Sequence, residues 1–379
     1  MMPQDYGRLL ADSDRIHAFD RAIHKAVKPD DIVAELGCGV GTFGIFAARA
    51  GARRVFGVDS GPVIELARQV SEANQVGVEF IAGDARDVDL PEPATLLIFE
   101  DFSTGVLDGP VPGILNSARE RWMAEQHRVI PQRITLNLAP IQAASAWREA
   151  LPLEELGERP YGIDLKPLAD IAPKSMSIIR SPKDAVLLAP SSVVLDHDLV
   201  ESLPSRWSTN GVFELPGDGS FDGLCMWFDM VLDDTESYSN NPASSGVYGQ
   251  VFFPAPARWP VNSGDRLGFK LRFDSTPFGG VWKWSFDLAG IDGKTRSRWS
   301  SNTFAASAIT PQSLQRYRPE DVVHLSPRAE REAMILNLAD GRRTLEAICS
   351  EVQKQCDIPD RETALTLVLR TIENRRVFK

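Results

Sequence analysis

The sequence predicts three folded domains in series: a parallel α/β sheet, an antiparallel β domain and a small helical domain. Three observations indicate them. Apolar runs alternate with helical patterns over residues 31–100, a period of two dominates from about residue 131, and helical periodicity returns near the end of the chain. We therefore expect the α/β domain at 1–130, the antiparallel β domain at 131–300, a linker at 301–323 and the helical domain at 324–379.

The first domain consists of repeated strand–helix–strand units. The expected strands are DIVAEL, RRVFGVD, VEFIAGD and ATLLIFE, and the helical patterns TFGIFAARAG and PVIELARQVSEAN lie between them. Strands that are joined through helices run parallel and are covered on both faces. We therefore expect a parallel sheet with helices on its faces.

The second domain shows alternation with a period of two, which gives each expected strand a single apolar face. In DRLGFKLRF and VWKWSFDL the apolar sets are Leu267, Phe269, Leu271, Phe273, and Trp282, Trp284, Phe286, Leu288. Clusters rich in Gly, Pro, Asp and Asn, such as LPGDGSFDG, separate these runs. This spacing predicts half-buried antiparallel strands that form a sandwich or a barrel.

A polar segment without periodicity separates the third domain from the second. The segment 301–321 carries two prolines, so we expect a linker there. Helices are expected at 327–338, 344–354 and 360–375. The tail is therefore predicted to be a small helical unit.

Composition and charge exclude several classes of protein. The chain has 41 Lys and Arg against 52 Asp and Glu, a net charge of −11, which argues against broad binding of nucleic-acid phosphates. The start lacks the apolar core of a signal peptide, and no apolar run is long enough to span a membrane. The four cysteines and five histidines show no metal-ligand spacing. We expect a cytoplasmic protein with reduced thiols, no metal, and no membrane or nucleic-acid partner.

A glycine-rich turn follows the first expected strand, and an acidic residue ends each of the first two strands. In such a turn, backbone N–H groups approach a ligand at a helix N-terminus, and a carboxylate after the second strand accepts ribose hydroxyls. A Gly-Asp pair after the third strand can meet an adenine edge. The candidate cofactor-binding residues are Glu35, Gly37, Gly39, Gly41, Asp59, Ser60, Asp84 and Ala85.

This set of motifs is typical of binding S-adenosylmethionine (SAM). An NAD site is the alternative, although dinucleotide folds prefer the spacing GxGxxG. A tight strand-to-helix turn with surface acids is the structural alternative.

Longer stretches resemble the protein arginine N-methyltransferase family. LLADSDRIHAFDRAI at 9–23 is similar to the family's M-L-x-D-x-x-R helix, and ELGCGVGTFGIFAARAGARRVFGVDS at 35–60 to its glycine motif. The similarity continues through GDARDVDLP, ATLLIFE, GLCMWFDMVLD and FFPAPARWPVNSGDRLGFKLRF, over about residues 5–290. Locally, DSDR and the EDFST loop look closest to members that stop at monomethylarginine.

The resemblance implies a Rossmann-like SAM-dependent methyltransferase sheet followed by a β-barrel. It implies SAM as the cofactor, Arg15 as the partner of the SAM carboxylate, and methyl transfer to a guanidino nitrogen of arginine in a peptide or protein. Glu100 matches the first glutamate of the family's double-glutamate loop. Two such carboxylates localise the guanidinium charge and aim one nitrogen at the methyl group.

Two positions depart from the family pattern. The second loop glutamate falls on Gly109, so Asp108 beside it and Asp101 are the candidates for a second carboxylate; a solvated loop is the alternative. The family's Thr-His-Trp loop reads SGVYGQ here, without the histidine, and Tyr248 is a candidate aromatic wall for the substrate or a core residue. Tyr6 is the second aromatic candidate near the substrate.

Three functions therefore stay open. The first is methylation of arginine in a peptide or protein, the second is methylation of free arginine or a related metabolite, and the third is a SAM-binding scaffold without catalysis. The segment RPYGIDLKPLADIAP at 159–173 resembles the family's dimerisation arm, which implies a homodimer. In the tail, LADGRRTLEAICSEV resembles small winged-helix-like domains of the PqqD type that grip leader peptides; a helical appendage that packs on the barrel or on a partner chain is the alternative.

Overall fold

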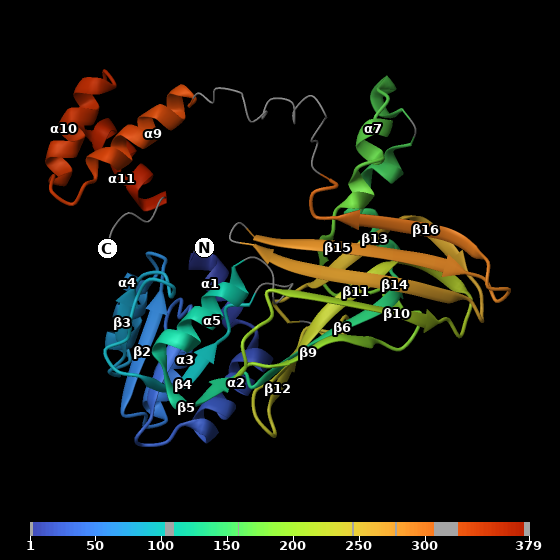
Figure 1. Cartoon of the computed structure of the whole chain (residues 1–379), viewed down its shortest axis with the longest axis horizontal. Helices are drawn as coiled ribbons and strands as arrows, with labels where there is room; N and C mark the ends of the chain where they lie inside the picture. The colour runs from blue at the N-terminus through green and yellow to red at the C-terminus, as the bar shows by residue number, and fades with distance from the viewer. Residues whose placement is uncertain are drawn as a thin grey trace. The chain divides into compact units, whose positions relative to one another are not determined.

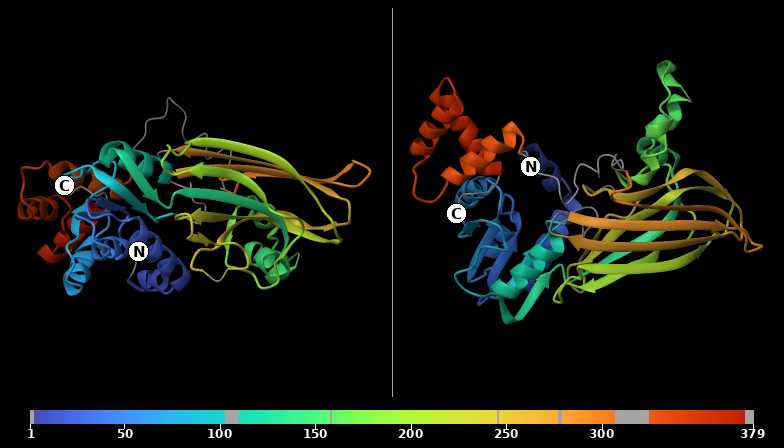
Figure 2. Two further views of the ribbon diagram at one scale, coloured as in Figure 1. Left: turned by 90° about the horizontal axis from the view of Figure 1, so that it is seen from below. Right: turned by 45° about the horizontal axis from the view of Figure 1, so that its top comes forward.

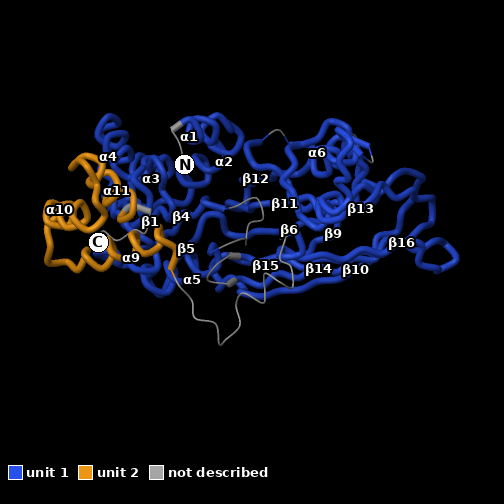
Figure 3. Tube along the Cα trace, turned by 90° about the horizontal axis from the view of Figure 1, so that it is seen from above, with its two compact units in different colours: residues 1–308 blue, residues 309–379 orange. Residues whose placement is uncertain are grey.

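The computed structural model describes residues 3–102, 110–157, 159–244, 246–276, 279–306 and 325–374. The chain divides into two compact units, 1–308 and 309–379 (Figure 3). The first unit contains a parallel sheet with its helices and two antiparallel sheets, and the described part of the second contains helices α9, α10 and α11 (Figure 1).

A five-stranded sheet with the order β3-β2-β1-β4-β5 forms the first domain. All its strand pairs are parallel, which confirms the sequence prediction. Every residue of β1 is buried, as expected for a strand covered on both faces. The strands are β1 (Ile32–Leu36), β2 (Arg54–Asp59), β3 (Glu79–Ala82), β4 (Ala94–Phe99) and β5 (Met123–Ile130). The helices are α1 (Pro3–Leu10), α2 (Ser13–Ala26), α3 (Thr42–Arg49), α4 (Ile64–Ala73) and α5 (Val111–Trp122).

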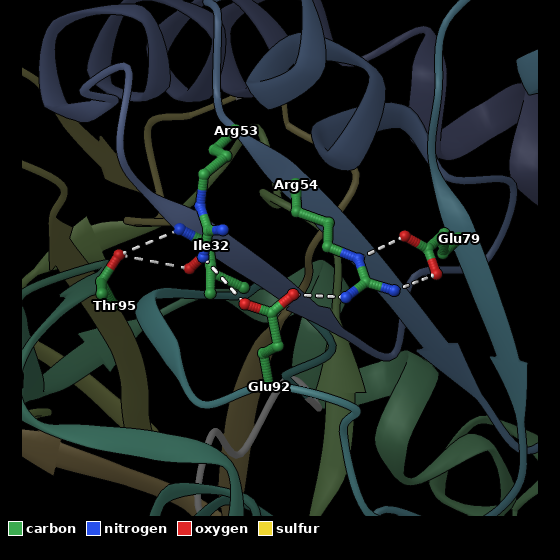
Figure 4. Close-up of polar contacts among 6 residues, drawn as sticks. All are labelled: Ile32, Arg53, Arg54, Glu79, Glu92 and Thr95. Carbon is green, nitrogen blue, oxygen red and sulfur yellow. Dashed lines mark hydrogen bonds and ion pairs between the residues drawn. The ribbon is translucent and has the colours of Figure 1, made fainter.

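Ion pairs tie the strands together near the start of β2 (Figure 4). Arg54 donates to both carboxylate oxygens of Glu79, at 2.5 and 2.8 Å, and also bonds to Glu92. Arg53 reaches Glu92 at 2.8 Å, and the Thr95 hydroxyl accepts the Ile32 N–H at 3.2 Å. Exposed pairs of this kind contribute about 0–1 kcal/mol each. These contacts lie at the end of the sheet opposite the glycine-rich turn, where they serve the fold.

Two antiparallel sheets follow the parallel sheet. One has the order β10-β14-β15-β16; the other has the order β7-β13-β11-β6-β8, with β9 also paired to β6 and β12 to β11. The strands are β6 (Arg133–Gln142), β7 (Ser177–Ile179), β8 (Val186–Leu187), β9 (Ser192–Asp198), β10 (Arg206–Glu214), β11 (Gly219–Val231), β12 (Ser237–Ser239), β13 (Gln250–Val261), β14 (Arg266–Thr276), β15 (Gly279–Ala289) and β16 (Thr295–Asn302).

The apolar faces predicted for β14 and β15 are buried between the sheets. All eight predicted side chains, from Leu267 to Leu288, are at most 4% exposed. Phe221 on β11 packs against Phe286 on β15 with ring centroids 5.2 Å apart, and Phe253 on β13 packs against Trp284 at 5.1 Å. The expected sandwich or barrel is thus present as two antiparallel sheets (Figure 2). Aromatic side chains from both sheets form their shared core.

An arm is inserted between β6 and β7. It contains α6 (Ala144–Ala150), α7 (Lys166–Ala169) and 3₁₀ turns at Pro152–Leu156, Pro160–Gly162 and Ala172–Lys174. Helix α7 projects away from the sheets (Figures 1 and 2). Tyr161, Ile163 and Leu168 expose 90%, 56% and 53% of their surface, so the arm presents three large apolar side chains among charged ones in one chain.

The second unit has a hydrophobic core of its own. Its helices α9 (Pro327–Leu338), α10 (Leu345–Gln355) and α11 (Arg361–Asn374) confirm the three predicted helices. Ile335, Val352 and Val368 are fully buried in this core. Residues 307–324, on which most of the predicted linker falls, lie outside the described residues. None of the helices within the described ranges is both long and apolar enough to cross a membrane.

Candidate active site

The candidate site lies where the strand order of the parallel sheet reverses. β1 pairs with β2 on one side and with β4 on the other, and Leu36 lies opposite Phe99 at their carboxyl ends. Ligands of open α/β sheets bind in the crevice at such a switch point. The turns that follow β1, β2, β3 and β4 carry most of the candidate residues.

The glycine turn after β1 needs glycine at three positions. Gly37, Gly39 and Gly41 have φ values of 68°, 52° and 78°, in the left-handed region that other residues rarely adopt. The turn is held to β2 because the N–H groups of Gly37 and Cys38 donate to the Val58 carbonyl. Because glycine has no side chain, other groups can approach the backbone of this turn closely.

Glu35 stabilises the start of the helix that follows this turn. Its buried carboxylate accepts the N–H groups of Gly44 at 2.7 Å and Phe43 at 3.3 Å, in the first turn of α3. These N–H groups have no partner within the helix. Burial raises the pKa of Glu35 to about 8. Both Glu35 oxygens serve the backbone, so the residue supports the cofactor turn.

Asp59 lies beside the same turn at the end of β2. Its oxygens accept the Gly39 N–H at 2.9 Å and the Gly61 N–H at 2.6 Å, and its side chain stays partly open. A carboxylate has further lone pairs for the hydroxyls of a ribose. Ser60, the next residue, is exposed in the turn after β2.

The Gly-Asp pair after β3 adjoins Asp59. The Gly83 N–H donates to the Asp59 carbonyl at 2.9 Å, which brings the two turns together. Asp84 forms an ion pair with Arg86 at 2.7 Å, and Ala85 is buried. The structure therefore gathers the predicted ribose and adenine residues at one edge of the sheet.

Tyr6 on α1 covers the glycine turn. A Cβ atom at Gly39 would lie 2.9 Å from the Tyr6 ring. Burial, together with the Asp59 and Asp101 carboxylates, raises the pKa of Tyr6 to about 12. Sequence analysis made Tyr6 a candidate substrate residue, whereas the structure brings its ring to the glycine turn.

Arg15, Glu100 and Tyr248 form a buried polar cluster. Arg15 Nη1 lies 2.7 Å from Glu100 Oε2, and the Tyr248 hydroxyl donates to Glu100 Oε1 at 2.9 Å. The Arg15 and Glu100 side chains are 2% and 11% exposed. Burial raises the pKa of Glu100 to about 7, although Arg15 and Tyr248 both lower it. The Tyr248 ring also packs edge-on against Phe228, as a core residue would, and its role as an aromatic wall for the substrate stays a prediction.

Arg15 keeps one donor for a ligand. Its Nη2 donates to the Leu9 carbonyl at 2.5 Å, but its Nε is buried and has no partner among the residues that the structure describes. A buried donor without a partner is costly, and a ligand carboxylate would satisfy it. This orphaned donor and the bare glycine turn fit the amino-acid end and the nucleoside end of SAM.

The two candidates for a second carboxylate have different outcomes. Asp101 lies against Gly37, where a Cβ atom would approach the Asp101 Cβ to 2.7 Å, so its side chain is on the side of the glycine turn. Asp108 and Gly109 lie outside the described residues. The structure therefore brings both Glu100 and Asp101 into the site. Asp101 lies against the glycine turn, whereas Glu100 contacts Arg15 and Tyr248.

Sequence analysis missed Asp12 and Tyr238. Asp12 Oδ1 caps α2 by accepting the Arg15 N–H at 3.2 Å, and Oδ2 accepts the Tyr238 hydroxyl at 2.7 Å and the Val247 N–H at 2.8 Å. A Cβ atom at Gly246 would lie 2.4 Å from the Tyr238 hydroxyl, which occupies the space beside the loop that lacks the family's histidine. The DSDR stretch contains Asp12, but no sequence pattern links it to a tyrosine on β12.

The charge around the glycine turn favours a cationic ligand. Three carboxylates, Asp59, Glu100 and Asp101, act on one another there, and Arg15 is the cation paired with Glu100. SAM carries a sulfonium and an ammonium group, whereas NAD brings a pyrophosphate that these carboxylates would repel. Within the described ranges, His, Cys, Asp and Glu side chains form no cluster suited to a metal ion.

Comparisons with known proteins agree with this geometry. Residues 33–129 match a family model described as a methyltransferase domain. The chain is 26% identical over 251 residues to a probable protein arginine N-methyltransferase 6 of Arabidopsis thaliana, covering 62% of this chain and 54% of that protein. It is 23% identical over 313 residues to protein arginine N-methyltransferase 1 of Saccharomyces cerevisiae, covering 78% and 89%. The alignment thus spans about half the length of the first relative.

Solved structures share the fold. The PRMT1 enzyme–prozyme heterotetrameric complex of Trypanosoma brucei with AdoHcy superposes with a TM-score of 0.69 at 18% identity, over 78% of this chain and 97% of that chain. Protein arginine methyltransferase 10 of Arabidopsis thaliana superposes with a TM-score of 0.68 at 20% identity, over 80% and 98%. Residues 33–129 thus match a methyltransferase domain, and the chain is similar in sequence and fold to protein arginine N-methyltransferases.

Proposed function

We propose that this protein transfers a methyl group from SAM to a guanidino nitrogen of arginine in a peptide or protein. The observation that carries the proposal is the buried Arg15–Glu100–Tyr248 cluster beside the glycine turn. The cluster supports the proposal because it combines a carboxylate, which can bind a cationic acceptor, with an arginine, which can bind the cofactor. Glu100 would bind the guanidinium of the acceptor, and Arg15 would bind the carboxylate of SAM.

The proposed chemistry depends on orientation. A guanidinium has a pKa above about 12 and a delocalised charge, so each of its nitrogens is a poor nucleophile. An ionised Glu100 draws positive charge to one side of the group and leaves electron density on the nitrogen that faces the methyl donor. The new N–CH₃ bond forms as the S–CH₃ bond of SAM breaks, S-adenosylhomocysteine leaves, and the nitrogen releases a proton.

Asp108 is proposed as the second carboxylate of the grip. Asp101 faces the glycine turn, which leaves Asp108 as the remaining candidate from sequence analysis. If Asp108 does not reach the acceptor, the grip is weaker, and this favours the second candidate function, methylation of free arginine or a related small metabolite. The family's second loop glutamate is replaced by Gly109 in this chain, and this replacement also favours the third candidate, a SAM-binding scaffold without catalysis.

The partners follow from the arm, the tail and the charge. The large apolar side chains exposed on the arm, Tyr161, Ile163 and Leu168, support a homodimer, because exposed apolar side chains that lie together mark interaction sites. The helical tail, 324–379, is proposed as a PqqD-like docking unit for a peptide substrate. The net charge of −11 supports a protein that binds no nucleic acid, and the four free cysteines support a cytoplasmic location.

The test is methyl transfer from isotope-labelled SAM to three acceptors: free arginine, an arginine-rich peptide, and a peptide encoded beside the gene. Mass spectrometry of each acceptor locates the label. Label on a guanidino nitrogen of a peptide supports the proposal, and label on free arginine alone supports the second candidate. Binding of SAM without label in any acceptor supports the scaffold.

A further inference from the structure

We propose that the Asp101 carboxylate binds the ammonium group of the methionine moiety of SAM, and so recognises the cofactor and does not grip the acceptor. This inference rests on the proposed function for its ligand. It concerns a residue that the sequence made a candidate for the acceptor side.

The position of Asp101 is set by the sheet. Leu36 and Phe99 lie opposite each other at the ends of β1 and β4, and Gly37 and Asp101 follow closely after them in the two facing turns. A Cβ atom at Gly37 would lie 2.7 Å from the Asp101 Cβ and 2.9 Å from its Oδ2. Asp101 therefore packs on the bare backbone of the glycine turn, the surface that the ligand must approach.

The four carboxylates around the glycine turn differ in their hydrogen-bond partners. Glu35 and Asp59 accept backbone N–H groups with both oxygens, and Glu100 is held by Arg15 and Tyr248. Across the residues that the structure describes, Asp101 has no hydrogen bond or ion pair. Its side chain is open to solvent, yet restricted hydration in the cleft and the nearby Asp59 raise its pKa. A cationic group is the partner that this position lacks.

Asp101 and Arg15 together offer partners for the two charged groups of an amino acid, its ammonium and its carboxylate. The carboxylate and the ammonium of the methionine moiety are attached to one carbon atom, so their protein partners must lie side by side. Arg15, with its orphaned Nε, contacts Glu100, the residue directly before Asp101. Arg15 is thus linked through Glu100 to the turn that carries Asp101, and we assign the carboxylate and the ammonium of the methionine moiety to these two residues.

The surroundings of Asp101 differ from those of Glu100. Charge on Asp101 acts on Tyr6 and responds to Asp59, both of which contact the glycine turn through Gly39. Glu100 instead contacts Tyr248, which belongs to the antiparallel domain. The two consecutive carboxylates thus serve opposite sides of the transferred methyl group: Asp101 the cofactor and Glu100 the acceptor.

The test is calorimetric binding of two ligands to the full chain. One is S-adenosylhomocysteine; the other is its desamino analogue, which keeps the adenosyl group and the carboxylate but lacks the amine. In the wild-type protein the amine should strengthen binding about tenfold or more, the scale of a charge-assisted hydrogen bond. Asp101→Asn should remove most of this advantage and leave the affinity for the desamino analogue unchanged, which also shows that the variant is folded.

A matched control is Asp30→Asn, an exposed aspartate in the turn before β1, at the other end of the sheet. It should leave both affinities unchanged. Equal loss for both ligands, or unchanged affinities in Asp101→Asn, would overturn the inference. Unchanged affinities together with a raised KM for the arginine acceptor would assign Asp101 to the acceptor. A wild-type protein that binds neither ligand would instead refute the proposed function.

Discussion

At the scale of the residue, Glu100 is the centre of the account. It is buried between a cation and a hydroxyl donor, and its pKa of about 7 lies close to neutral pH. Burial disfavours the ionised form, whereas Arg15 and Tyr248 favour it. Because the ionised form grips the acceptor, we expect kcat/KM to rise as the pH increases through about 7.

Replacing Tyr248 should shift the pH at which kcat/KM rises, which is the acidic limb of the pH profile. Tyr248→Phe removes the hydrogen bond that stabilises ionised Glu100, so the pKa of Glu100 rises and the limb shifts to higher pH. The measurement is kcat/KM against pH, with Tyr161→Phe as a control because Tyr161 is 90% exposed on the arm. A limb that stays in place in Tyr248→Phe, or moves to lower pH, would show that this hydrogen bond does not tune Glu100.

At the scale of the element, Asp12 joins helix α2 to the antiparallel domain. One oxygen caps the helix, and the other binds Tyr238 on β12 and the Val247 N–H. Farther along α2, Arg21 and Lys25 form ion pairs with Glu236 and Asp233. The helix that carries Arg15 is thus fixed to the loop that carries Tyr248.

Tyr238→Phe should weaken this junction. The lost hydrogen bond to a carboxylate predicts a decrease in the free energy of unfolding of about 1.5–3 kcal/mol, measured by urea denaturation. Tyr161→Phe, on the exposed arm, is the matched control and should change stability by less than about 0.5 kcal/mol. Equal stability of the two variants would mean that the Tyr238 hydroxyl does not brace the helix.

The elements differ in how far sequence could predict them. Strands β14 and β15 were predicted residue by residue because alternation directly reports which side chains are buried. Helix α5 and strand β5 were not, since β5 lies at the edge of its sheet and its sequence, MAEQHRVI, is largely polar. Glu100 and the glycines were found from local motifs. The contact of Asp12 with Tyr238 depends on two domains meeting, which no local pattern encodes.

At the scale of the whole molecule, the arm should control assembly. Ile163 and Leu168 expose about half of their surface or more near the arm tip. The double variant Ile163→Asp and Leu168→Asp places two charges in a surface that a dimer would bury, and should give a monomer by sedimentation velocity. The wild-type chain should sediment as a dimer; equal sedimentation of the two proteins would rule out the arm tip as the interface.

The tail should act on substrate selection. Because the second unit has its own core, deleting residues 324–379 should leave the first unit folded. We expect a higher KM for a long peptide substrate and nearly unchanged turnover of a short arginine peptide, since a separate docking unit raises the effective concentration of the long one. Equal losses on both peptides would instead indicate a structural role for the tail.

The central claim is that Glu100 grips an arginine guanidinium for methylation by SAM. The most direct measurement is the yield of methylarginine, by mass spectrometry, from wild-type protein and Glu100→Gln at saturating SAM, with arginine peptides and free arginine as acceptors. The account predicts methylarginine from the wild type and at least about 100-fold less from the variant, with a far smaller change in affinity for S-adenosylhomocysteine. Methylarginine formed by Glu100→Gln at the wild-type rate, or none formed by a wild-type protein that binds S-adenosylhomocysteine, would contradict it.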